Sequence, residues 1–235
     1  MIVQQWKQQA DKSRRIVAFG SSNTELSFSN AGRHNWVDWL YINLRKHVGN
    51  HVVVINQGIG GETVLNLLER IDRDVRPLEP SMVIVTIGGN DTNIGMPVSE
   101  YRENLCQVCA IISSYGAQPV LQTYYCPLYH QMDADYRERF EARMNVIRDL
   151  AEELDLPLVD QYAFFEPFYS EQPDEYIKLM RDRLHVNHLG NLAMGQYISY
   201  CFGLPALPVP EDIASEFNPL YDRLKSLSGR MAESS

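Results

Sequence analysis

The sequence has few cysteines and no long apolar run, and each shortage excludes a class of protein. Only four cysteines occur among 235 residues, so the chain does not resemble a small secreted domain stabilised by disulfides. No stretch approaches the roughly 18 consecutive apolar residues that a membrane-spanning helix needs. We therefore expect reduced cysteines, most of them in the core, and no membrane partner.

Basic residues are also scarce relative to acidic ones. The chain has 21 Lys and Arg against 30 Asp and Glu, which gives a formal net charge of −9 at pH 7. Nucleic acids and anionic membrane surfaces attract proteins through positive patches, so we expect neither as a partner. The segment Met1–Gln9 is too polar for a secretory signal peptide, and from this we expect a cytoplasmic protein.

Short apolar runs alternate with segments of helical periodicity about five times along the chain. The runs expected to form strands are Ile16–Phe19, Val52–Ile55, Met82–Ile87, Pro119–Tyr124 and Leu156–Asp160. Nearly continuous apolar strands separated by helices are typical of a parallel sheet covered on both faces. The sequence therefore predicts an α/β fold: a three-layer α/β/α, flavodoxin-like, doubly wound domain with a five-stranded parallel sheet.

Three segments follow from this pattern. Residues 1–13 form a polar lead-in, residues 14–203 hold the α/β domain, and residues 204–235 form a C-terminal extension. The extension is proline-rich at first and then carries apolar residues at helical spacing. We expect a helix there that either docks on the domain or binds a partner, including a second copy of the chain.

Chemically capable residues follow three of the predicted strands. Ser22 comes after the first, the Gly58–Thr63 loop after the second and Asn90 after the third. Because the carboxyl ends of parallel strands share one edge of the sheet, these residues should lie together. Acyl transfer to a hydroxyl needs a nucleophile and donors for the developing oxyanion. Ser22 supplies the hydroxyl, Gly61 can present a backbone N–H, and Asn90 carries a side-chain amide.

A base for this nucleophile occurs late in the chain. Asp182 and His185 are three residues apart, so a single turn can place the carboxylate against the imidazole and fix its tautomer. His188 is a rival base, but it has no aspartate three residues before it. Asp160 also ends a predicted strand and is a rival orienting acid. We favour Asp182 because its sequence proximity to His185 leaves less to chance.

Four sequence blocks resemble those of the SGNH hydrolases, also called the GDSL esterase/lipase family. In order they are Gly20-Ser21-Ser22-Asn23-Thr24, Asn56-x-Gly58-Ile59-x-Gly61-Glu62-Thr63, Gly89-Asn90-Asp91 and Asp182-x-x-His185-x-Asn187. Any one block occurs by chance, but all four in order, three of them at predicted strand ends, are typical of the family. One departure is Ser21, which stands where the family usually has aspartate.

The resemblance implies a serine esterase with Ser22, Asp182 and His185 as catalytic triad. The oxyanion hole would comprise the backbone N–H groups of Ser22 and Gly61 and the amide of Asn90. It also implies short-chain acyl esters, with O-acetylated carbohydrate favoured, as a small-molecule or carbohydrate substrate. Candidate substrate-binding residues near the strand ends are Asn23, Tyr124, Tyr129 and His130.

Other interpretations remain open at this point. A lysophospholipase or thioesterase would act on longer acyl chains, and an inactive relative would be a carbohydrate-binding or scaffold protein. The Gly58-x-Gly60-x-x-Thr63 passage also resembles a dinucleotide-binding loop, but that fingerprint needs glycine or alanine at the last position. Cys106 and Cys109 form a single Cys-x-x-Cys without the four ligands of a zinc site. We therefore expect neither a metal nor a cofactor.

Overall fold

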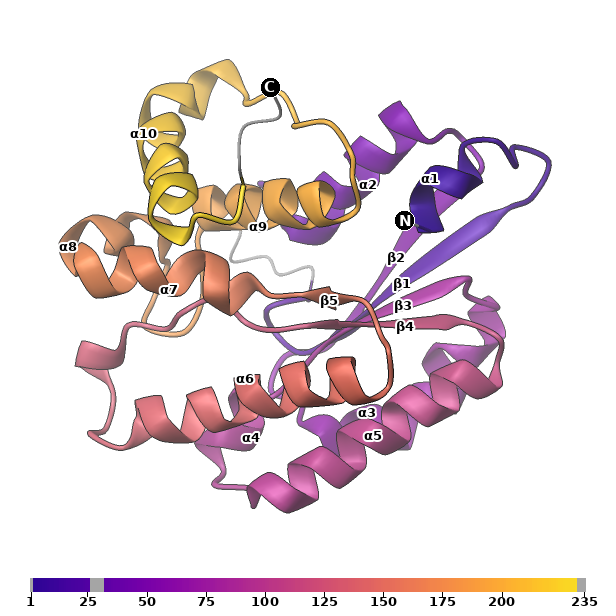
Figure 1. The fold of residues 1–235 in the computed structure, drawn as a ribbon, viewed down its shortest axis with the longest axis horizontal. Coiled ribbons are helices and arrows are strands. Elements are labelled where there is room, and N and C mark those ends of the chain that lie inside the picture. The colour runs from indigo at the N-terminus through magenta and orange to yellow at the C-terminus, as the bar shows by residue number, and fades with distance from the viewer. Residues whose placement is uncertain (1, 26–31, 232–235) are drawn as a thin grey trace.

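Five parallel strands form the central sheet of the protein. The computed structural model describes residues 2–25 and 32–231. The strands are β1 (Arg14–Gly20), β2 (Val52–Gly58), β3 (Met82–Thr86), β4 (Gln118–Gln122) and β5 (Leu158–Val159). Their order is β2-β1-β3-β4-β5 and all pairs are parallel, so the predicted α/β fold is confirmed (Figure 1).

Helices cover both faces of the sheet (Figure 1). On one face α2 (Trp36–His47) packs against α9 (His188–Cys201). On the other, α5 (Val98–Ser114) contacts both α3 (Val64–Asp74) and α6 (Tyr136–Glu153). The remaining α-helices are α1 (Ile2–Trp6), α4 (Gly89–Asn93), α7 (Gln161–Glu171), α8 (Pro173–Tyr176) and α10 (Glu211–Ser228). Short 3₁₀ turns are η2 (Arg76–Leu78), η3 (Tyr129–Gln131) and η4 (Ile177–Leu179).

The strand register aligns the ends that carry the chemically capable residues. Gly20, the last residue of β1, pairs with Gly58 at the end of β2 and with Thr86 at the end of β3. The side chains of β1 from Ile16 to Phe19 are fully buried, as expected for a strand inside a sheet covered on both faces. Ser22 and the loops after β2 and β3 therefore start from one level of the sheet edge.

The fifth strand and the helix that follows it differ most from the expectations. The fifth strand spans two residues rather than the five of Leu156–Asp160, because Asp160 caps α7 by accepting a hydrogen bond from the N–H of Ala163 (3.2 Å). The sequence did not indicate α7 at all. Its aromatic residues are buried on one side, but Ala163 and Pro167 lie on the other, so the contrast between an apolar and a polar face is weak.

The two terminal segments pack onto the domain. Within the polar lead-in, the side chains of Val3 and Trp6 are buried against the core. The C-terminal extension forms α10, which packs against α7 and buries Phe217 and Leu224. Residues 232–235 of the extension lie outside the described residues. Within the described ranges, no helix is both long enough and apolar enough to cross a bilayer.

Candidate active site

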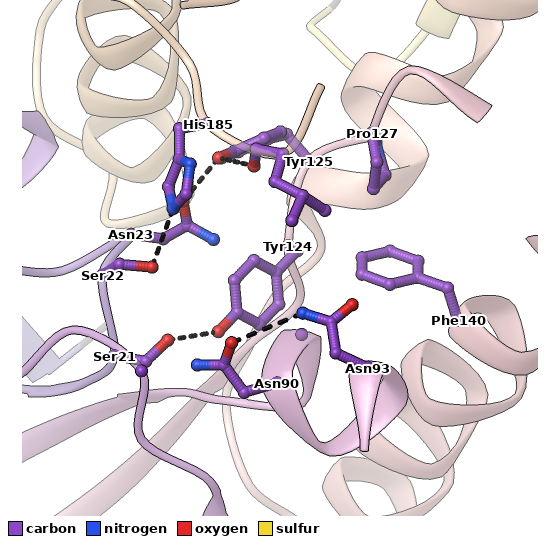
Figure 2. Close-up of a pocket in the computed structure, with 13 residues that line it drawn as sticks. Ser21, Ser22, Asn23, Asn90, Asn93, Tyr124, Tyr125, Pro127, Phe140 and His185 are labelled. Carbon is purple, nitrogen blue, oxygen red and sulfur yellow. Dashed lines mark hydrogen bonds between the residues drawn. The ribbon is translucent and has the colours of Figure 1, made fainter. Parts of the chain in front are cut away.

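Ser22 lies in a tight turn directly after β1. The carbonyl oxygen of Ser21 accepts a hydrogen bond from the N–H of Thr24 (2.9 Å), which closes the turn. The strand can end here only with glycine, because a Cβ on Gly20 would lie 2.4 Å from the carbonyl oxygen of Thr86 on β3. The turn leaves the side chain of Ser22 half-buried on the wall of a cavity (Figure 2).

The side chains of Ser22, His185 and Asp182 form a continuous line of hydrogen bonds. Ser22 Oγ lies 2.9 Å from His185 Nε2, and His185 Nδ1 lies 3.0 Å from each carboxylate oxygen of Asp182. When Nδ1 carries the ring proton, it donates to Asp182, and Nε2 is then free to accept from the Ser22 hydroxyl. The arrangement can therefore remove a proton from Ser22.

A short polar turn holds Asp182 against the imidazole. Its Oδ1 accepts hydrogen bonds from the backbone N–H groups of Leu184 (2.8 Å) and His185 (2.9 Å). Partial burial opposes the charged carboxylate, but the Leu184 hydrogen bond and the charge and hydrogen bonds of His185 outweigh it. The pKa of Asp182 is therefore lower than that of an ordinary aspartate. The carboxylate stays ionised, as a partner for an imidazolium must.

The helix after this turn is capped by Asn187. Its side chain accepts hydrogen bonds from the N–H groups of Leu189 (2.8 Å) and Gly190 (3.2 Å) at the start of α9. The same side chain donates to the carbonyl oxygen of Lys178 (2.7 Å). Asn187 therefore ties the His185 segment to both α9 and η4.

The rival residues lie elsewhere. Asp160 accepts two 2.9 Å hydrogen bonds from Arg148 and one of 3.0 Å from Thr123 Oγ1. Burial opposes its charge, but the hydrogen bonds and the positive charge of Arg148 dominate, so the pKa of Asp160 is lowered. His188 lines a different cavity together with Arg33. The structure thus places Asp182, and not Asp160, against His185.

Hydrogen-bond donors face the same cavity from two further loops. Gly61 has a φ of +84°, a conformation that favours glycine, and it lines the cavity with Ser22. Asn90, in the first turn of α4, donates one amide hydrogen to the carbonyl oxygen of Glu62 (2.8 Å). An amide has two hydrogens, so the second is available to a ligand in the cavity. The oxyanion-hole candidates and His185 therefore border one space.

Ser21, in the family's aspartate position, points away from His185. Its Oγ lies 2.9 Å from the hydroxyl of Tyr124, and both side chains are buried (Figure 2). The buried hydroxyl of Ser21 is therefore paired with that of Tyr124. Tyr124 also lines the cavity that Ser22 borders.

The cavity has a volume of about 270 Å³ and runs from Ser22 past Tyr124 to Phe140 (Figure 2). Its lining residues are Ser21, Ser22, Asn23, Gly61, Gly89, Asn90, Asn93, Tyr124, Tyr125, Pro127, Phe140, Leu184 and His185. The expectation that Tyr129 and His130 line it does not hold in the structure. The hydroxyl of Tyr129 bonds that of Tyr162 (2.9 Å), and the backbone N–H of His130 donates to the hydroxyl of Tyr169 (3.0 Å).

Sequence reasoning missed how Tyr125 is used. Its hydroxyl lies 2.5 Å from Asn23 Oδ1 and 2.6 Å from the carbonyl oxygen of Leu184, and it accepts from the N–H of Val186 (3.1 Å). One buried hydroxyl therefore joins the Ser22 turn to the His185 segment. The link spans residues remote in sequence, so no motif could reveal it.

Over residues 2–25 and 32–231, no group of three or more His, Cys, Asp or Glu side chains is arranged to hold a metal ion.

The sequence matches the model of the GDSL-like Lipase/Acylhydrolase family over residues 18–193. It is 29% identical over 138 residues to "Thioesterase 1/protease 1/lysophospholipase L1" of Escherichia coli (strain K12), covering 57% of this chain and 59% of that protein. It is also 22% identical over 222 residues to "Probable rhamnogalacturonan acetylesterase YesY" of Bacillus subtilis (strain 168), covering 87% and 99%.

The fold is similar to that of solved esterases. An acetylxylan esterase of Geobacillus stearothermophilus, Axe2, superposes with a TM-score of 0.70 at 19% identity, covering 85% of this chain and 98% of that one. LAE5, an alpha/beta hydrolase enzyme from the metagenome of Lake Arreo, superposes with a TM-score of 0.69 at 23% identity, covering 82% and 96%. At 19% and 23% identity, these two comparisons show a shared fold and nothing more specific.

Proposed function

The chain belongs to the GDSL-like lipase/acylhydrolase family of carboxylic ester hydrolases, and from that premise we propose that it is a carbohydrate O-acetylesterase working through a serine acyl-enzyme. The observation that carries this proposal is the line of hydrogen bonds from Ser22 through His185 to Asp182, with two further donors around the same cavity.

Acylation begins at Ser22. His185 Nε2 accepts the hydroxyl proton while Oγ forms a bond to the ester carbonyl carbon. The carbonyl oxygen gains negative charge, which the N–H groups of Ser22 and Gly61 and the amide of Asn90 stabilise. Asp182 stabilises the imidazolium. His185 then donates its proton to the departing alcohol as the bond between carbon and alcohol oxygen breaks.

Deacylation repeats these steps with water. His185 accepts a proton from a water molecule, whose oxygen attacks the acyl carbon, and the same donors stabilise the second oxyanion. The acid then leaves as His185 returns the proton to Ser22 Oγ. Ser22, Gly61, Asn90 and His185, which carry out these steps, all line one cavity.

The size and lining of the cavity support a small acyl group on a polar alcohol. At about 270 Å³, it lies just below the roughly 300–1,000 Å³ usual for ligand pockets. Aromatic rings of Tyr124 and Phe140 line it beside the amides of Asn23 and Asn93, a combination that suits sugar rings with hydroxyl groups. The similarity to a protein named a rhamnogalacturonan acetylesterase supports the same substrate class.

Hydrolysis of longer acyl chains is the second candidate. Two large apolar side chains are exposed, Ile59 in the loop after β2 to 40% and Ile94 at the end of α4 to 65%. An acyl chain that extends beyond the cavity could lie on them. The similarity to a thioesterase and lysophospholipase favours the same alternative. A series of p-nitrophenyl esters separates the two: rates highest at two to four carbons support the acetylesterase, and a maximum at eight or more overturns it.

A fluorophosphonate probe tests the nucleophile itself. We expect it to label the wild type and Ser21→Ala but not Ser22→Ala, and acetyl ester hydrolysis to disappear only in Ser22→Ala. Ser21→Ala is the matched control because its hydroxyl precedes Ser22 in the same turn and contacts Tyr124 instead of His185. A wild type that is neither labelled nor active at neutral pH would support the inactive, carbohydrate-binding interpretation.

A further inference from the structure

A buried arginine on α3 lies behind the oxyanion-hole candidates. Only 3% of the Arg70 side chain is exposed. Its guanidinium donates to Glu62 Oε2 (2.7 Å) and to the carbonyl oxygens of Gln57 (2.9 Å) and Gly20 (3.2 Å). It also lies 4.4 Å from the ring centroid of Phe19, on β1. One rigid group therefore connects β1, β2 and the loop that follows β2.

Each of these partners is close in sequence to an oxyanion donor. Gly20 lies two residues before Ser22, and Glu62 directly follows Gly61. The carbonyl oxygen of Glu62 accepts the amide hydrogen of Asn90 (2.8 Å). The three donors come from three different segments. Arg70 bonds directly to Gly20, near Ser22, and to Glu62, beside Gly61, and it reaches Asn90 through Glu62.

The loop that carries Gly61 needs such support. It includes three glycines in four positions, Gly58, Gly60 and Gly61, and glycine has the largest backbone freedom to lose on ordering. Besides Arg70, the N–H of Ile59 also donates to the carbonyl oxygen of Gly20 (3.1 Å). A planar guanidinium with a partly buried carboxylate partner fixes direction as well as distance.

We propose that Arg70 is a positioning residue that sets the spacing of the three oxyanion donors. It is absent from the lining of the cavity, so it acts through Gly20, Gln57 and Glu62 and does not touch the substrate. The proposal rests on the proposed function. It predicts that Arg70 contributes to transition-state stabilisation and little to binding of the ground state.

The test compares Arg70→Met and Arg70→Lys with wild type on p-nitrophenyl acetate. We expect kcat to fall by about 10²-fold in Arg70→Met, the effect of misplacing reacting groups by roughly 1 Å, with KM nearly unchanged. Arg70→Lys keeps the positive charge and can keep the hydrogen bond to Glu62, so its kcat should lie between those of Arg70→Met and wild type. Arg148→Met is the matched control: it breaks another arginine–carboxylate pair, with Asp160, and should leave kcat unchanged.

A double-mutant cycle with Asn90→Ala identifies the route. If Arg70 acts through the oxyanion donors, Arg70→Met should cost less in the Asn90→Ala background than in wild type. Equal losses in both backgrounds, or an unchanged kcat in folded Arg70→Met, overturn the proposal. If Arg70→Met does not fold, Glu62→Gln and Arg70→Lys are used in the same cycle. Full activity of Ser22→Ala would instead overturn the proposed function, whatever Arg70 does.

Discussion

The two sides of the candidate active site are held by different kinds of contact. On the acid–base side, the side chains of Asp182 and His185 are 44% and 26% exposed. The hydrogen bonds that hold Asp182 come from Leu184 and His185, within one turn of the chain. On the oxyanion side, the side chains of Arg70 and Glu62 are 3% and 15% exposed, and Arg70 bonds residues up to 50 positions away.

Because of this difference in exposure, we expect substitutions on the two sides to affect activity and stability to different degrees. A charge in a half-exposed turn is largely solvated, so removing it changes the chemistry more than the fold. A buried charge with several partners cannot be removed without leaving those partners unpaired. Asp182 should therefore tolerate substitution structurally, and Arg70 should not.

The largest expected effect is on the acid–base side. Asp182→Asn should lower kcat/KM by about 10⁴-fold. The amide oxygen can still accept from the N–H groups of Leu184 and His185, but its NH₂ group then faces His185 Nδ1 and favours the wrong tautomer. Steady-state hydrolysis of p-nitrophenyl acetate measures the rate, and urea unfolding of the same sample checks the fold.

Asp160→Asn is the control for that prediction. It removes the rival carboxylate, which bonds Arg148 and Thr123, so it should lower stability and leave kcat nearly unchanged. A rate loss confined to Asp160→Asn would make Asp160 the orienting acid and contradict the assignment of Asp182.

The next largest effect is on the free energy of unfolding, and here the larger loss is expected on the oxyanion side. Arg70→Met should lower the free energy of unfolding by about 3–5 kcal/mol, because it leaves the partly buried carboxylate of Glu62 without its cation and the carbonyl oxygens of Gln57 and Gly20 without their donor. Asp182→Asn should cost less than about 1 kcal/mol, since its carboxylate is half-exposed. Equilibrium urea unfolding at neutral pH measures both. Equal losses would show that exposure does not separate the two sides.

The same contrast explains what the sequence could predict. Asp182 and His185 are three residues apart, and Ser22 and Asn90 follow predicted strands whose ends must share one edge. Local spacing and sheet geometry were therefore sufficient to bring these residues together. Arg70 lies on the inner side of a helix, and helical periodicity carries no information about acceptors on β1 and β2.

The cavity wall was predicted least well for a related reason. Tyr129 and His130 follow the fourth strand, as the wall residues Tyr124 and Tyr125 do. The chain then turns into η3 and presents Tyr129 to Tyr162 on α7, a helix that the sequence pattern did not indicate. Side-chain direction beyond a strand end depends on such neighbours, which only the folded chain reveals.

The third prediction compares two neighbouring amides on the oxyanion side. Asn90→Ala should lower kcat by about 10²–10³-fold, the usual cost of one oxyanion donor, and leave KM nearly unchanged. Asn93→Ala is the matched control, because Asn93 lines the same cavity and its amide lies 3.5 Å from Asn90 Oδ1. Stopped-flow acylation rates measure both variants. Equal losses would assign the effect to the shape of the cavity.

The smallest expected effect is the dependence of stability on pH through Asp182. Burial of Asp182 raises its pKa, but the hydrogen bond from the N–H of Leu184 and the charge of His185 outweigh burial, so the pKa is lowered in the folded state. A lowered pKa means that the unfolded chain binds more protons at mildly acidic pH, so this stabilisation is present above the ordinary aspartate pKa of about 3.9. It is lost as the pH falls through the lower, folded-state value. The free energies of urea unfolding of wild type and Asp182→Asn should therefore differ at pH 6 and converge as the pH falls below about 4. A difference of the same size in acid would mean that the carboxylate charge contributes nothing and that the substitution only disturbs the turn.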